Sequence, residues 1–119
     1  MVLDGNAWKK IAFPYAVTVD SVLEFDFSST REGEIHGIGF DTDDVLSPDR
    51  TFELFGSQTW GLQNYATYVD PPGGVAHYVI PVGTFYTGAF DRLFFVNDHD
   101  TGAPKGNGTF SNVKVYEGP

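Results

Sequence analysis

The stretch Val22-Leu23-Glu24-Phe25-Asp26-Phe27 decides the fold class. Its apolar side chains, Leu23, Phe25 and Phe27, alternate with two carboxylates. Successive side chains of a β-strand point to opposite faces, so this alternation places the apolar groups on one face and the acids on the other. The stretch therefore predicts a strand with one face in a core and the other in water.

Similar segments follow one another along the chain. Fourteen glycines and seven prolines separate runs rich in Val, Ile, Phe, Tyr and Thr, the residue types favoured in strands. No apolar pattern at helical spacing lasts three turns without Gly or Pro. About eight short antiparallel strands predict an all-β fold, a β-sandwich or jelly roll. The further strands are expected at Ala7–Phe13, Tyr15–Val19, Glu34–Phe40, Thr51–Phe55, Val75–Val82, Arg92–Asn97 and Thr109–Tyr116.

Two of these segments have features beyond a plain core pattern. In Glu34–Phe40, Gly37 and Gly39 leave one face of the strand shallow. Either a flat ligand or another sheet could lie close to that backbone, or a large ring from a neighbouring strand could fill the space. The segment Arg92–Asn97 contains Leu93-Phe94-Phe95-Val96 and is apolar on both faces, which predicts a central strand.

Length, charge and cysteine content limit the classes of protein to consider. A chain of 119 residues fits one domain, covering residues 1–119. The net charge is −9 and the seven Lys and Arg are scattered, so neither nucleic acid nor an anionic membrane surface is an expected partner. No apolar run approaches the roughly 20 residues needed to span a bilayer. Without cysteine the chain has no disulfide and no thiolate metal ligand.

The segment Gly56–Tyr68 has the clearest pattern of a binding site. Three large rings occur within nine residues, and amide side chains are interleaved with them. A sugar ring offers an apolar C–H face and a rim of hydroxyls, which suit an exposed aromatic ring and an amide or carboxylate group. We therefore expect a polysaccharide site here; alternatively, these rings are core residues and loop anchors. The expected ligand-binding residues are Gln58, Trp60, Asn64, Tyr65 and Tyr68.

Two acidic loop segments suggest a metal. Asp41-Thr42-Asp43-Asp44 follows the glycine-rich strand, and Asn97-Asp98-His99-Asp100 follows the expected central strand. Alternating carboxylates with a nearby amide are the hard oxygen ligands that calcium takes. The pattern predicts a structural calcium site, although solvated turn residues are an equally simple interpretation. The expected metal ligands are Asp41, Asp43, Asn97, Asp98 and Asp100.

Catalysis has a weaker basis in the sequence. Glycoside hydrolysis usually needs two carboxylates across a cleft, and Glu24, Asp26, Glu34 and Glu53 supply only unspecific candidates. The three histidines show no metal-ligand spacing, and His77 is expected to be a packed sheet residue. We therefore expect a protein that is not an enzyme.

Five segments of the sequence, taken together and in their order along the chain, resemble those of a known class of domain. The chain is similar to the non-catalytic carbohydrate-binding modules appended to bacterial plant-cell-wall hydrolases. The resemblance implies a β-sandwich that binds β-linked plant polysaccharide, such as β-glucan, cellulose, xyloglucan or xylan, often with structural calcium. It rests on Gly5-Asn6-Ala7-Trp8-Lys9-Lys10-Ile11, Val22–Phe27, Glu34–Asp41, His77-Tyr78-Val79-Ile80-Pro81-Val82 and Phe110-Ser111-Asn112-Val113-Lys114-Val115-Tyr116.

The resemblance also implies a place for the domain in a larger protein. Such modules are covalently attached to a catalytic domain and secreted with it, so extracellular location is expected. The first residues, Met1-Val2-Leu3-Asp4, have neither the charged start nor the apolar centre of a signal peptide. Two other functions remain open, a protein-interaction or adhesion sandwich and a small glycan hydrolase or lyase.

Overall fold

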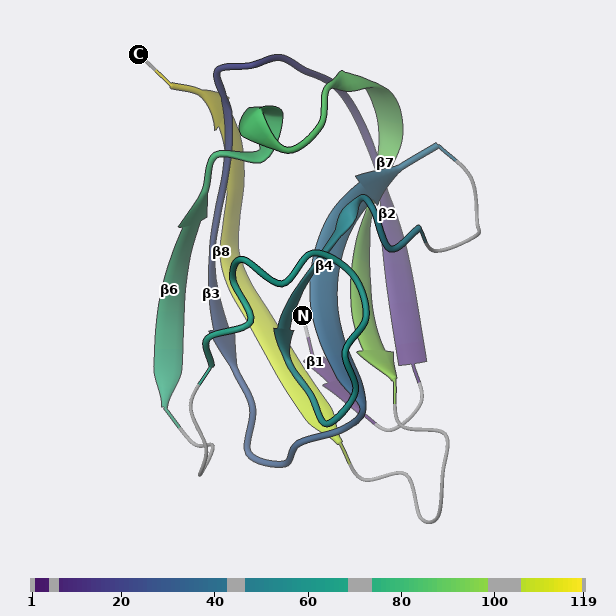
Figure 1. The fold of residues 1–119 in the computed structure, drawn as a ribbon, viewed down its shortest axis with the longest axis vertical. Coiled ribbons are helices and arrows are strands. Elements are labelled where there is room, and N and C mark those ends of the chain that lie inside the picture. Colours follow the sequence, from purple (N-terminus) through teal and green to yellow (C-terminus); the bar gives the residue numbers. More distant parts are fainter. Residues whose placement is uncertain (1, 5–6, 43–46, 69–73, 99–105, 119) are drawn as a thin grey trace.

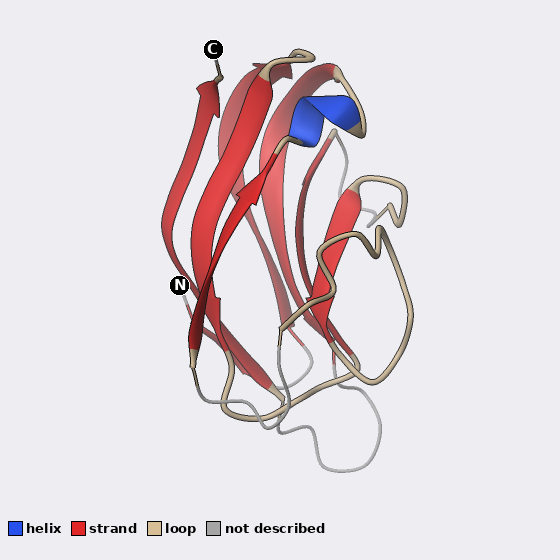
Figure 2. Cartoon of the chain, turned by 60° about the vertical axis from the view of Figure 1, so that its left-hand side comes forward, coloured by secondary structure: helices blue, strands red, loops and turns tan. Residues whose placement is uncertain are grey.

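The chain folds as a sandwich of two four-stranded antiparallel sheets (Figures 1 and 2). The computed structural model describes residues 2–4, 7–42, 47–68, 74–98 and 106–118. Sheet A has the strand order β1-β8-β3-β6 and sheet B the order β2-β7-β4-β5. Within the described residues the strands are β1 Val2–Asp4, β2 Ala7–Val17, β3 Ser21–Ser28, β4 Ile35–Asp41, β5 Thr51–Phe55, β6 Val75–Ile80, β7 Gly88–Asp98 and β8 Asn107–Glu117. The predicted all-β sandwich is confirmed.

Several strands differ from the prediction. The segments expected on either side of Pro14 form one strand, β2, whose register against β7 shifts between Ala12 and Tyr15. This irregularity accommodates a proline, which lacks the N–H needed for the ladder. The strand expected to reach Val82 ends at Ile80, because Val82–Thr84 forms a 3-10 turn after Pro81. The three-residue strand β1 was not predicted, since it is too short to show an alternation.

The core lies between the two sheets. On β3, Leu23, Phe25 and Phe27 are fully buried, as their alternation predicts. The ring of Phe110, on β8, lies 5.9 Å from that of Phe25 and 5.0 Å from that of Phe95 on the opposite sheet. Each such ring stabilises the fold by about 1.5–3 kcal/mol when fully buried. Aromatic side chains therefore join the two layers.

Sheet B also has a second apolar layer, on its outer face. The strand β7 lies between β2 and β4, which confirms the predicted central strand. Its side chains Phe94 and Val96 are buried, as is Ile35 on β4, yet none belongs to the core cluster between the sheets. The ring of Trp8, on β2, lies 5.4 Å from that of Phe94. Outer-face side chains of sheet B are thus covered by other parts of the chain.

The two glycines of β4 have a different role from those considered in the sequence. A Cβ atom on Gly39 would lie 2.1 Å from the carbonyl oxygen of Arg50, and one on Gly37 would lie 2.8 Å from that of Phe52. The backbone of β5 and of Arg50 therefore occupies the space that the sequence analysis assigned to a ligand, another sheet or a ring. Glycine is required here for close backbone approach.

No described helix has the length and apolar character needed to cross a bilayer.

Candidate functional site

The segment that follows β5 returns along the edge of sheet B. The N–H of Leu62 donates to the carbonyl of Thr51, and the N–H of Glu53 donates to the carbonyl of Leu62. The N–H of Gln58 donates to the carbonyl of Glu34 at 3.0 Å, just before β4. Gly61 has a φ of +89°, which favours glycine at the turn between these attachments. The segment is fixed to the sheet by backbone hydrogen bonds on both sides of Trp60.

Trp60 borders a hollow on the outer side of sheet B. The hollow has a volume of about 300 Å³ and combines apolar side chains with an amide and a carboxylate. Two lining residues, Trp60 among them, belong to the segment that follows β5. The others belong to β4 and β7. The lining residues are Ile35, Gln58, Trp60, Val96 and Asp98.

The second tryptophan pairs with Val96, one of the residues that line this hollow. Trp8 is the register partner of Val96 across the β2–β7 ladder, and 46% of its surface is exposed. Both tryptophans of the chain are therefore neighbours of Val96. We call this surface the tryptophan face and define it by Trp8, Ile35, Gln58, Trp60, Val96 and Asp98.

The sequence analysis did not select Trp8. A signal for it was present, because Trp8 shares a strand face with Lys10, and a ring on the same side as a lysine is expected at the surface. Of the two amide side chains that the sequence predicted as ligand-binding, one lies at the hollow and one does not. Gln58 lies at the hollow and its Nε2 donates to Glu34 Oε2 at 2.7 Å. Asn64 is exposed and is not among the lining residues.

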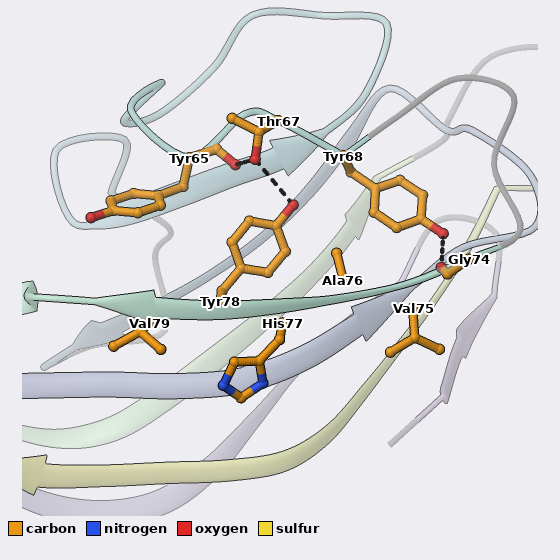
Figure 3. Close-up of a pocket in the computed structure, with 9 residues that line it drawn as sticks. All are labelled: Tyr65, Thr67, Tyr68, Gly74, Val75, Ala76, His77, Tyr78 and Val79. Carbon is orange, nitrogen blue, oxygen red and sulfur yellow. Dashed lines mark hydrogen bonds between the residues drawn. The ribbon is translucent and has the colours of Figure 1, made fainter.

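The two predicted tyrosines lie away from Trp60, around a separate hollow of about 480 Å³ (Figure 3). Tyr65, Tyr68, Tyr78 and Ala76 line it between the returning segment and β6, and we call it the tyrosine hollow. On β6, Ala76 and Tyr78 point toward the hollow, whereas His77 points to the opposite side (Figure 3).

Tyr68 is a buried anchor and not a surface ring. Only 8% of it is exposed, and its ring lies 5.0 Å from that of Phe27 and 4.9 Å from that of Phe55. Its hydroxyl oxygen accepts the N–H of Ser29 at 3.0 Å and contacts the carbonyl oxygen of Gly74. The single aromatic site expected from Gly56–Tyr68 is thus separated into two locations by the return of the chain.

The acidic residues expected to share a calcium ion are also separated. Asp41 is the register partner of Arg92, six residues from Asp98 along β7, which places the two acids about 20 Å apart at the usual strand rise. Asp41 is buried and its Oδ1 accepts from Arg50 Nη1 at 3.1 Å. Asn97 is buried and its Nδ2 donates to the carbonyl of Gly106.

Asp41 therefore cannot share one ion with Asn97 or Asp98. Asp43 and Asp100 lie outside the described residues. Among the residues that are described, no group of three or more His, Cys, Asp or Glu side chains could hold a metal ion. Calcium at one segment alone stays a prediction.

The outer face of sheet A carries a polar cluster that sequence analysis missed. His77 was expected to be packed in the sheet, but its side chain is half exposed between two carboxylates of β3. Its Nδ1 lies 2.6 Å from Asp26 Oδ1 and its Nε2 lies 2.8 Å from Glu24 Oε2. Tyr116 donates to Glu24 Oε1 and Asn112 Nδ2 donates to Asp26 Oδ2. The cross-strand pairing of β6, β3 and β8 creates this cluster, which no local pattern indicates.

The cluster shifts the acidity of its members in opposite directions. The hydrogen bond from Tyr116, followed by that from His77, lowers the pKa of Glu24. The bonds from Asn112 and then His77 lower the pKa of Asp26. The bonds to Asp26 and then Glu24 raise the pKa of His77. This is the behaviour of a salt-bridge network, and neither carboxyl is adjusted toward the protonated state that a general acid needs.

No family model, no curated protein and no solved structure matches this chain.

Proposed function

We propose that the protein binds polysaccharide at the tryptophan face and does not cleave it. The observation that carries the proposal is the position of Trp60 beside a hollow that also presents Gln58 and Asp98, with the exposed Trp8 paired to the lining residue Val96. An exposed ring can stack on the apolar face of a pyranose while an amide and a carboxylate bond its hydroxyls. Trp8 and Asp98 are held by the ladders of sheet B, and the segment that carries Gln58 and Trp60 is attached to that sheet by backbone hydrogen bonds, so these groups are arranged before a ligand arrives.

The proposed ligand class is β-linked plant polysaccharide, including β-glucan, cellulose, xyloglucan and xylan. This choice comes from the resemblance to carbohydrate-binding modules. The same resemblance supports a covalently attached hydrolase as partner and an extracellular location. The module would raise the effective concentration of the enzyme at its substrate without new chemistry.

Binding without cleavage is supported by the surroundings of three of the four candidate carboxylates. Glu24 and Asp26 lie on the outer face of sheet A, bonded to His77, whereas the tryptophan face is on sheet B. Glu53 is buried beneath the segment that carries Trp60. Binding energy directed at a ground-state chain does not accelerate its cleavage.

Affinity electrophoresis against soluble β-glucan, xyloglucan and xylan tests the proposal. We expect Trp60→Ala and Trp8→Ala each to weaken retardation, because each removes a stacking surface. If a sugar ring stacks as strongly as a nucleic-acid base, the loss is about 1–3 kcal/mol per ring. Tyr116→Ala is the matched control, since Tyr116 is 38% exposed but lies on the outer face of sheet A. It should bind as the wild type does.

Three results would contradict the proposal. Retardation unchanged in both tryptophan variants would place the site elsewhere, and absence of retardation by every polysaccharide would favour a protein-interaction surface. Sustained release of reducing ends by the purified chain would indicate a hydrolase or lyase.

A further inference from the structure

Glu53 is a buried carboxylate next to the tryptophan face. It lies on β5, and 2% of its surface is exposed. Its register partner on β4 is Gly37, and Gly37 pairs in turn with Val96 on β7. Because Val96 is the partner of Trp8, one row across sheet B joins Glu53 to the centre of the tryptophan face.

One oxygen of Glu53 holds the backbone of the segment that carries Trp60. Oε1 accepts the N–H of Trp60 at 3.2 Å and Nε2 of Gln63 at 2.8 Å. The same Gln63 nitrogen lies 3.1 Å from the carbonyl oxygen of Trp60 and 3.2 Å from that of Gly61. A single acceptor thus organises the turn from Trp60 to Gln63.

Burial of the other carboxylate oxygen of Glu53 lowers the stability of the fold. Oε2 is buried and has no hydrogen-bond partner among the described residues. Burial is the main cause that raises the pKa of Glu53, against the lowering effect of its bonds to Gln63 and Trp60. A carboxyl group without full hydrogen bonding is expensive to bury compared with an apolar side chain of similar size. The contact with Trp60 is the feature that an apolar residue at this position could not supply.

We propose that Glu53 is a positioning residue that fixes Trp60 at the tryptophan face. The inference rests on the proposed function, because it assigns Trp60 a ligand. A fixed turn saves the ligand the cost of ordering the segment when it binds, which appears as higher affinity. Glu53 itself is covered by protein, so it acts through Trp60 and does not contact the sugar.

Substitutions that keep or remove the acceptor test this role. Glu53→Gln retains an oxygen that can accept from Trp60 and Gln63, whereas Glu53→Leu removes it. We expect Glu53→Leu to bind soluble β-glucan, xyloglucan or xylan at least tenfold more weakly than the wild type, and Glu53→Gln to stay within about twofold. The control is Leu54→Ala, which opens a cavity in the core from the next position of β5. It should lower the melting temperature but leave the affinity of the folded protein unchanged.

A spectroscopic measurement follows Trp60 without any ligand. In a Trp8→Phe background Trp60 is the remaining tryptophan, since the chain has two. We expect its emission to shift to the red and its quenching by acrylamide to increase with Glu53→Leu, but not with Glu53→Gln. Gln63→Ala, a change at an exposed residue, should cause a smaller shift in the same direction and gives a readout if Glu53→Leu does not fold.

The outcomes separate the two proposals. If the wild type binds none of the polysaccharides, the proposed function fails, while the emission of Trp60 still tests the positioning. The positioning role is overturned if Glu53→Leu keeps full affinity, if Glu53→Gln loses as much as Glu53→Leu, or if Leu54→Ala loses as much as either. It is also overturned if the emission of Trp60 is the same in all variants.

Discussion

At the scale of the residue, the aromatic side chains of Gly56–Tyr68 differ in role according to their hydrogen bonds and burial. Trp60 borders an open hollow, whereas the hydroxyl of Tyr68 is bonded to the backbone at Ser29 within a buried ring cluster. The composition of the segment identified both rings as candidates. Only the path of the chain distinguishes the platform from the anchor.

Tyr68→Phe should lower stability without changing polysaccharide binding. The variant keeps the ring contacts with Phe27 and Phe55 but leaves the N–H of Ser29 without its acceptor. An unsatisfied buried donor costs about 1–3 kcal/mol, and we expect this loss in urea-induced unfolding. Tyr65→Phe is the control, because no described residue forms a hydrogen bond with the Tyr65 hydroxyl. Equal stability of the two variants would contradict the anchoring role.

At the scale of the element, the cluster on sheet A ties the edge strand β6 to β3. The carboxylates of Glu24 and Asp26 have lowered pKa values, so both are ionised at neutral pH. A neutral imidazole has one N–H and can donate to one carboxylate only. Because both ring nitrogens of His77 lie within hydrogen-bond distance of a carboxylate, these contacts favour the imidazolium form, in agreement with the raised pKa of His77.

The cluster predicts a specific dependence of stability on pH. The raised pKa of His77 means that its contribution is fully present below the unfolded value of about 6.5 and is lost as the pH rises through the folded value. The lowered pKa values of Glu24 and Asp26 have the opposite effect, so their contribution is lost in acid. The contacts between β6 and β3 should therefore be strongest at mildly acidic pH.

Unfolding curves of the wild type and His77→Asn, measured from about pH 6 to about pH 9, check this dependence. We expect the stability of the wild type to fall toward that of the variant as the pH rises. Because the imidazole is half exposed, the difference should be modest and smaller at high salt. Parallel curves across this range would show that His77 does not titrate against the two carboxylates.

At the scale of the whole molecule, local sequence patterns predicted the sandwich of two sheets but not which side chains meet on its surface. The alternation in Val22–Phe27 and the apolar run of β7 were sufficient to predict a sandwich with a central strand. The neighbours of Trp8 depend on the register of β2 against β7, which involves residues far apart in the chain. The separation of Asp41 from Asp98 depends in the same way on the antiparallel pairing of β4 and β7. Residue types therefore indicated the chemistry, and non-local pairing determined which groups meet.

Amide chemical-shift mapping with a soluble β-glucan or xylan oligosaccharide tests the central claim most directly. If the tryptophan face is the binding site, the amides of Trp8, Gln58, Trp60, Val96 and Asp98 should shift together on titration. Those of Glu24, His77 and Tyr116, on the outer face of sheet A, should remain unchanged. Shifts concentrated at Thr67, Ala76 and Tyr78 would place the ligand in the tyrosine hollow and contradict the account, as would shifts centred on sheet A.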